Sequence, residues 1–256
     1  AFTGNKFEFR MVGSRDSISE CNVVLNTIAA EAFKEACDRL EKADDFEMAV
    51  HDLIKEYAID HQRIVFNGNG YAPEWAEEAK RRGLPNLPSM VDAIPALTTD
   101  KAVKLFEEFH VFTKTELESR AEIQYEIYAK AVNIEAKTMI DLATKQIIPA
   151  VVRYTTVLAD SVNTVRAVGD IDVSVQLELL KKCSALLKTT NSAMKNLSDV
   201  VAKVSEIPEG RERAVYCKDI VCKAMTELRT PVDELEMLVD KSMWPMPSYG
   251  DLMFIL

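Results

Sequence analysis

Apolar residues recur at helical spacing along most of this chain, and the first such patterns lie in its N-terminal third. One helix is predicted over residues 22–43 and a second over residues 45–61. A short third helix begins at Pro73 and ends before Gly83, because proline suits the first helical turn and glycine suits its end. This part of the chain is therefore predicted to be helices joined by tight connections.

The longest periodic pattern covers residues 113–165 without interruption. Its steps, mostly of four, four and three residues, match a nearly straight helix, so supercoiling should be weak or right-handed. Pro149 lies inside the pattern and is expected to kink the helix or break it in two. The stripe consists of Leu117, Ala121, Tyr125, Tyr128, Val132, Ala136, Met139, Ala143, Ile147, Ala150, Tyr154, Leu158, Val162 and Val165.

Two more long helices are predicted, over residues 172–205 and 208–229, and a short fourth helix is expected to start at Pro231. Helices of this length joined by short turns favour an antiparallel bundle. In the first of them, apolar residues at seven-residue intervals form one line and a second line runs beside it. These residues are Leu180, Leu187, Met194 and Val201, then Cys183, Thr190, Leu197 and Val204.

The first residues of the chain follow a different period. Over residues 5–14 apolar and charged side chains alternate, which predicts a β-strand with one apolar and one charged face. No hairpin partner follows it, and an isolated strand leaves its backbone groups unpaired. We therefore expect the chain to be the C-terminal part of a larger polypeptide. The apolar face has Phe7, Phe9 and Met11, and the charged face has Lys6, Glu8 and Arg10.

Two loop-like segments remain. Residues 67–70 contain two Asn-Gly pairs, which favour positive backbone dihedrals and predict a plain turn; a phosphate-binding loop is the functional alternative. Residues 243–256 are apolar, aromatic and proline-rich, with no helix pattern. An exposed tail of that composition would promote aggregation, so we expect it to dock on its own chain or on a neighbouring subunit.

Composition narrows the class of protein. The formal net charge of −10 argues against a nucleic-acid surface and against binding to anionic membranes. No apolar run approaches the ~18–20 residues that span a bilayer, and no signal peptide is recognisable, so a cytoplasmic protein is expected. The five cysteines are odd in number and fall mostly in predicted helices, which favours reduced thiols over a disulfide framework.

The charged face of the opening strand has three possible meanings from its residues alone. It is a solvated surface, an anion site that uses Arg10, or a divalent-metal and phosphate site. In the third case Glu8 would supply a hard oxygen ligand for Mg²⁺ or Mn²⁺, and Arg10 would neutralise phosphate or carboxylate charge. The pattern does not choose among them.

Longer segments resemble a known family. The segment 2–14 followed by 22–27 is similar to the last catalytic motif of type III glutamine synthetases. Further similar segments cover residues 63–71, 81–87, 133–136, 138–141 and 244–252, so the resemblance extends over essentially the whole chain. It implies a mainly α fold: the end of an α+β catalytic domain (residues 1–85, strand plus helices), a helical C-terminal domain (86–242), and an apolar tail (243–256).

The resemblance also implies a chemistry, namely ATP-dependent ligation of ammonia to L-glutamate by way of γ-glutamyl phosphate. Glu8 would be a metal ligand and Arg10 would face ATP, the substrates and the transferred phosphoryl group. Mg²⁺ or Mn²⁺ would be the cofactor, and the family forms homo-oligomers that resemble stacked hexameric rings. The family's other metal ligands belong upstream, so we expect the isolated chain to be inactive.

Two alternatives stay open. The chain could be chiefly a non-catalytic assembly or regulatory module of a ring oligomer, or part of another carboxylate–amine ligase.

Overall fold

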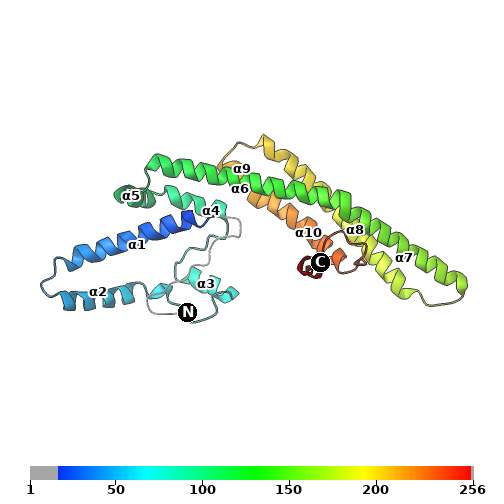
Figure 1. The fold of residues 1–256 in the computed structure, drawn as a ribbon, viewed down its shortest axis with the longest axis horizontal. Coiled ribbons are helices and arrows are strands. Elements are labelled where there is room, and N and C mark those ends of the chain that lie inside the picture. Colours follow the sequence, from blue (N-terminus) through cyan, green and yellow to red (C-terminus); the bar gives the residue numbers. More distant parts are fainter. Residues whose placement is uncertain (1–16, 255–256) are drawn as a thin grey trace. The chain divides into compact units, whose positions relative to one another are not determined.

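The computed structural model describes residues 17–254, and every regular element in that range is a helix. The prediction of a mainly α-helical chain is therefore confirmed for these residues, whereas the strand predicted over residues 5–14 lies outside them. The described residues form two compact units (Figure 1). Unit 1 contains residues 17–88 and 92–121, and unit 2 contains residues 89–91 and 122–254.

The helices predicted in the N-terminal third are present in unit 1. Asp45 precedes the second helix, and its Oδ1 accepts a hydrogen bond from the amide of Met48 at 3.0 Å. Pro73 occupies the first turn of the third helix, and Gly83 follows its end with a φ of 70°. The helical elements of this part are α1 (Ser19–Leu40), α2 (Phe46–Asp60), η1 (Gln62–Ile64), α3 (Pro73–Arg81), α4 (Met90–Ala93, whose first two residues belong to unit 2), η2 (Ile94–Thr98) and α5 (Asp100–Glu108).

Helices α1 and α2 of unit 1 are poorly covered. Each has a single buried residue, Thr27 in α1 and Leu53 in α2. Surface ion pairs connect α1 to its neighbours: Lys34 pairs with Glu108 of α5 at 3.2 Å, and Arg39 pairs with Glu56 of α2 at 2.7 Å. Such pairs contribute little stability compared with apolar burial. Large apolar side chains on the two helices stay exposed: Ile28, Phe33, Phe46, Met48, Ile54 and Ile59.

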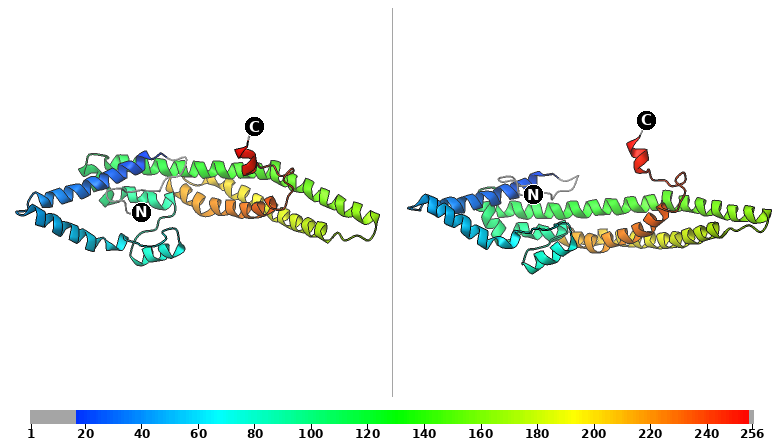
Figure 2. Two further views of the ribbon diagram at one scale, coloured as in Figure 1. Left: turned by 60° about the horizontal axis from the view of Figure 1, so that its bottom comes forward. Right: turned by 90° about the horizontal axis from the view of Figure 1, so that it is seen from below.

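Unit 2 is built around long helices that pack side by side. Helix α8 contacts both α7 and α10, and α7, α8 and α10 follow one another up and down (Figures 1 and 2). The predicted antiparallel bundle is thus present. Its elements are α6 (Lys114–Leu142, which begins in unit 1), η3 (Ala143–Ile147), α7 (Ile148–Val168), α8 (Ser174–Ala202), η4 (Lys203–Glu206), α9 (Arg211–Tyr216), η5 (Cys217–Val221), α10 (Cys222–Glu236) and α11 (Tyr249–Met253).

The core of the bundle comes from the predicted stripes. Every residue of the stripe over 117–165 is buried or half-buried. In α8 the second line is the deeper one, since Cys183, Thr190 and Leu197 are each 0% exposed while Leu187 is half-buried. Helix α8 is packed against two neighbours, so both lines are covered. The main cluster joins Ala129, Val132, Ala136, Ala143, Leu197, Val201, Val204, Cys217, Val221, Ala224 and Leu228.

Two prolines in the bundle affect their helices in different ways. Before Pro149 the helix does not break; it changes to the π-helical turn η3, where the amide of Ile148 bonds the carbonyl of Ala143. This shift of one residue accommodates an imino acid that has no N–H to donate. The separate helix expected from Pro231 is wrong, because α10 continues through this residue to Glu236. Pro231 is buried beside the core, and packing compensates for the lost hydrogen bond.

The C-terminal tail is partly docked on its own chain, as expected. Met243 and Trp244 pack against a second cluster that includes Val151, Cys183 and Leu235. The expectation that the tail has no helix is wrong for α11, which Ser248 and Asp251 start with a capping box. Its apolar side chains Tyr249, Leu252, Met253 and Phe254 are all exposed. None of the helices between residues 17 and 254 is long and apolar enough to cross a membrane.

Two glycines in unit 2 test the backbone conformation directly, because one requires glycine and the other does not. Gly210 precedes α9 with a φ of 80°, and a Cβ there would lie 2.6 Å from the Glu122 Oε2 atom. Gly169 follows α7 in an extended conformation, with open space around it. We expect Gly210→Ala to lower the free energy of unfolding by about 1 kcal/mol or more, and Gly169→Ala to leave it unchanged or raise it by up to ~1 kcal/mol. Urea denaturation measures both, and equal effects would contradict the assigned backbone.

Candidate functional site

The two residues predicted to act in catalysis, Glu8 and Arg10, lie outside the described residues. The metal site they were expected to join has no counterpart among the residues that the structure describes. Between residues 17 and 254 no three His, Cys, Asp or Glu side chains form a group that could hold a metal ion. His51 instead lies 3.2 Å from Asp52 on the surface, and the ring of His61 packs against that of Tyr57. The described part of the chain does not fit a divalent ion on its own.

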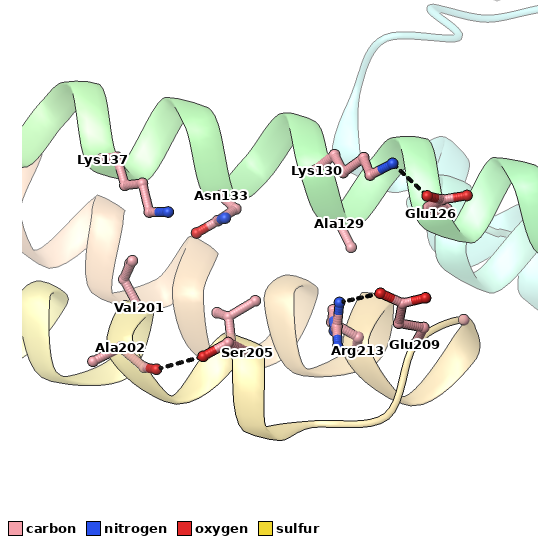
Figure 3. A pocket seen from close by; sticks show the side chains of 12 residues that line it. Glu126, Ala129, Lys130, Asn133, Lys137, Val201, Ala202, Ser205, Glu209 and Arg213 are labelled. Carbon is pink, nitrogen blue, oxygen red and sulfur yellow. Dashed lines mark hydrogen bonds and ion pairs between the residues drawn. The ribbon is translucent and has the colours of Figure 1, made fainter.

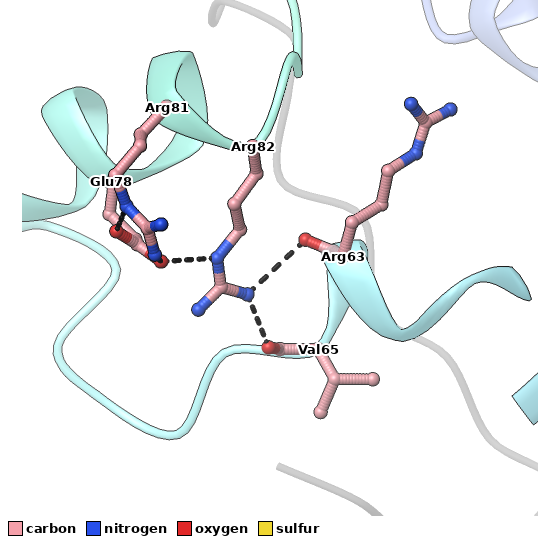
Figure 4. Close-up of polar contacts among 5 residues, drawn as sticks. All are labelled: Arg63, Val65, Glu78, Arg81 and Arg82. Carbon is pink, nitrogen blue, oxygen red and sulfur yellow. Dashed lines mark hydrogen bonds and ion pairs between the residues drawn. The ribbon is translucent and has the colours of Figure 1, made fainter. Parts of the chain in front are cut away.

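Two of the segments similar to glutamine synthetases do meet in unit 1. Arg82, just past the end of α3, donates from its Nη1 to the carbonyl oxygens of Val65 at 2.7 Å and Arg63 at 3.2 Å. Its Nε donates to Glu78 Oε1 at 2.5 Å (Figure 4). The guanidinium thus joins residues 63–65 to α3, while the side chain of Arg63 extends away from the contact. We call this set the Arg82 clamp.

Aromatic rings complete the Arg82 clamp. Phe66 stacks on Trp75 with ring centroids 4.2 Å apart, and the guanidinium of Arg82 lies 5.9 Å and 5.7 Å from the two centroids. Stacked rings and a cation over their faces are mutually attractive. Residues 63–66 are therefore fixed to α3 by both hydrogen bonds and packing.

Glu78 is the acidic member of the clamp. Hydrogen bonds from Arg81 and Arg82 lower the pKa of its carboxyl group to about 2 from an ordinary value of 4.5. A lowered folded-state pKa means that the ion pair stabilises the folded chain above about pH 4.5 and does so progressively less as the pH falls toward 2. The basic run at residues 80–82 stands at the C-terminal end of α3, where positive charge is favourable. Arg82 does more than this, because it also bonds the carbonyl oxygens of another segment, at Arg63 and Val65.

The Arg82 clamp predicts unequal roles for neighbouring arginines. Arg82→Ala removes three hydrogen bonds and the contact with both rings, so the free energy of unfolding should fall by about 1–3 kcal/mol at pH 7. Arg81→Ala is the matched control, since Arg81 is 74% exposed and contacts only Glu78 among these groups. Denaturant unfolding at pH 7 and pH 3 should show both losses becoming smaller in acid as Glu78 is protonated, while the gap between the variants remains, because the bonds from Arg82 to the two carbonyl oxygens and its ring contacts do not titrate. Equal losses for both would exclude the clamp.

The turn after the clamp is a plain turn. Asn69 Oδ1 accepts from the amide of Tyr71 at 3.0 Å, and the carbonyl of Asn69 accepts from Ala72 at 3.1 Å. These contacts use the amides of Tyr71 and Ala72, two of the donors that a phosphate loop would need free. Positive φ values were expected at Gly68 and Gly70, yet the described glycines with positive φ are Gly83 and Gly210. Gly68 is required for space instead, because a Cβ would lie 2.5 Å from the Phe66 ring.

The cysteines are free thiols, as the sequence predicted. Cys217 is fully buried, and burial raises the pKa of its thiol to about 11. The hydroxyl oxygen of Tyr128 lies 3.8 Å from Cys222 Sγ. Burial, and to a smaller extent the neighbouring Cys222, raise the pKa of Tyr128 to about 12. The Cys217 thiol and the Tyr128 hydroxyl stay protonated at neutral pH, so they belong to the core and not to a nucleophilic site.

Comparison with known proteins gives one family model and three relatives that match this chain. Residues 49–166 match the family described as the glutamine synthetase C-terminal domain. Beyond this segment, the similarity extends over the entire chain. The chain is 35% identical to the type-3 glutamine synthetase of Dictyostelium discoideum and 33% identical to a glutamine synthetase of Butyrivibrio fibrisolvens, with 100% of this chain covered in both cases. A glutamine synthetase of Bacteroides fragilis is 29% identical over 99% of the chain.

The resemblance predicted from the sequence is thereby confirmed, and the chain belongs to the glutamine synthetase family. It spans 36%, 37% and 36% of the lengths of these three relatives.

Proposed function

We propose that this chain forms part of a glutamine synthetase that joins ammonia to L-glutamate at the expense of ATP. The observation that carries the proposal is similarity along the whole chain to enzymes about three times as long. In this proposal residues 1–85 end the catalytic domain, residues 86–242 form the helical C-terminal domain, and residues 243–256 are the tail. The protein would act in the cytoplasm, which agrees with its free thiols.

The surface of unit 1 agrees with its packing against a further part of such an enzyme. Helices α1 and α2 each bury one residue, and exposed side chains such as Phe33 (72%) and Ile54 (63%) need a cover. The two-thirds of the relatives' length that this chain does not span would supply that cover. It would also supply the carboxylates missing from the described residues, since one carboxylate such as Glu8 does not hold Mg²⁺ or Mn²⁺ by itself.

The reaction needs no covalent bond to the protein. An oxygen of the γ-carboxylate of glutamate attacks the γ-phosphorus of ATP, and ADP leaves. Ammonia then loses a proton as its nitrogen attacks the γ-carbonyl carbon, and phosphate leaves. Concentrated positive charge favours both steps, because each gathers phosphate and carboxylate groups. Arg10 would provide part of that charge.

The proposal is tested by glutamine formation from glutamate, ammonia and ATP with Mg²⁺. The chain alone should form no glutamine. A polypeptide that joins it to the preceding part of the Dictyostelium discoideum relative should form glutamine readily. Clear turnover by the chain alone, or none by a joined polypeptide that is folded and assembled, would argue against the catalytic assignment.

The tail gives the oligomer a specific test. Four exposed apolar side chains on and after α11 are expected to contact a neighbouring subunit of a homo-oligomer: Tyr249 (85%), Leu252 (56%), Met253 (73%) and Phe254 (76%). Changing all four to serine should reduce the oligomer size in light scattering while leaving the unfolding temperature nearly unchanged. Val168→Ser alters an equally exposed residue (78%) of α7 and serves as the control. An unaltered oligomer size in the fourfold variant would remove this role.

A further inference from the structure

A cleft lined by both polar and apolar side chains opens in unit 2 where α6 faces the end of α8, η4 and the start of α9. Its volume is about 300 Å³, enough for a small metabolite. Figure 3 shows side chains from both walls directed into the gap. The lining residues with polar side chains are Glu126, Lys130, Asn133, Lys137, Ser205, Glu209 and Arg213.

One atom in this cleft lacks a partner. The Oδ1 atom of Asn133 is buried and accepts no hydrogen bond from any described residue, a property it shares only with Thr190 Oγ1 among the buried side-chain oxygens and nitrogens of residues 17–254. Of the two, only Asn133 lines the cleft. A buried amide oxygen without a donor costs free energy, so such a group indicates a molecule that supplies the donor.

The cleft has one more positively charged side chain than negatively charged ones. Lys130 pairs with Glu126, and Arg213 pairs with Glu209 at 3.1 Å (Figure 3). Lys137 has no hydrogen bond or ion pair with the described residues, and its Nζ lies on the same side of the cleft as Asn133. One positive charge therefore remains uncompensated beside the unsatisfied amide oxygen. A fitting ligand brings one anionic group and one N–H donor.

We propose that this cleft binds a free α-amino acid. Its carboxylate would pair with Lys137, and its ammonium group would donate to Asn133 Oδ1. A simple anion would satisfy the lysine and leave the amide oxygen without a donor, and a water molecule would do the reverse. The site consists wholly of unit 2 residues and includes neither Glu8 nor Arg10.

Calorimetric titration of the chain tests the ligand class with three probes. L-Glutamine carries both required groups, succinate carries carboxylates without an N–H donor, and inorganic sulfate is an anion without any donor at neutral pH. We expect saturable binding of L-glutamine at one site per chain, with succinate and sulfate at least about tenfold weaker. The titration does not depend on catalytic activity, so its result is independent of the proposed ligase function.

Variants assign the binding to the cleft. Asn133→Leu has nearly the same size and removes an unsatisfied buried oxygen, so it should keep or raise the unfolding temperature while weakening L-glutamine about tenfold or more. Lys137→Gln should weaken binding similarly, whereas Lys188→Gln, an exposed lysine of α8, should not. No saturable binding of L-glutamine, equal binding of sulfate, or unchanged binding in both cleft variants would overturn the proposal.

Discussion

Glu8→Ala is expected to reduce glutamine formation at least a hundredfold or so in a polypeptide that joins this chain to the preceding part of a relative. The substitution removes a carboxylate that would ligate Mg²⁺ or Mn²⁺. Even the removal of a group that only hydrogen-bonds a metal ligand lowers metal affinity or activity by about 10–100-fold. The assay is glutamine formation at saturating substrates and metal. Oligomer size should stay unchanged, because the substitution acts on the site and not on the helical bundle.

The control for Glu8→Ala is Glu35→Ala, which removes an exposed carboxylate from α1 without touching the predicted motif. Activity of this variant should match the parent protein. Near-normal activity of Glu8→Ala would exclude the metal role, and equal losses in both variants would point to a general effect of charge.

Leu235→Ala is expected to have the largest effect on stability. Leu235 is 0% exposed and belongs to the cluster that includes Ile147, Val151 and Cys183. Truncating a fully buried leucine removes apolar burial and leaves a cavity, which costs about 2–5 kcal/mol. Guanidinium unfolding followed by circular dichroism measures the loss.

Met237 lies two residues further along and is 84% exposed, so Met237→Ala should change the free energy of unfolding by less than about 0.5 kcal/mol. A small loss for Leu235→Ala, or a comparable loss for Met237→Ala, would mean that α10 does not present this face to the bundle.

The bundle was predictable from sequence because its signal is local and repeated. Residues such as Leu117, Ala136 and Leu158 recur at helical spacing, and the face they share is the face that is buried. Which of the two lines of apolar residues in α8 is more deeply buried was not predictable in the same way. Thr190 is a weak apolar residue, and only the position of two neighbouring helices makes it 0% exposed.

The prolines and the Arg82 clamp show what the sequence could not reveal. Pro231 has the same local chemistry as a helix-starting proline, and burial against the core keeps it inside α10. Arg82 lies in a basic run at a helix end, but its partners Val65 and Phe66 are far from it in sequence. Contacts between segments that are distant in sequence produce no periodic pattern of residues, so they cannot be predicted from the spacing of residues.

The central claim, that the chain belongs to an enzyme making glutamine through γ-glutamyl phosphate, is tested most directly by isotope transfer. The joined polypeptide is supplied with ATP, ammonia and glutamate labelled with heavy oxygen in the γ-carboxylate, and the phosphate released is analysed by mass spectrometry. Attack of the carboxylate on ATP predicts one labelled oxygen in each phosphate formed together with glutamine. Unlabelled phosphate, or label found in AMP, would contradict the account.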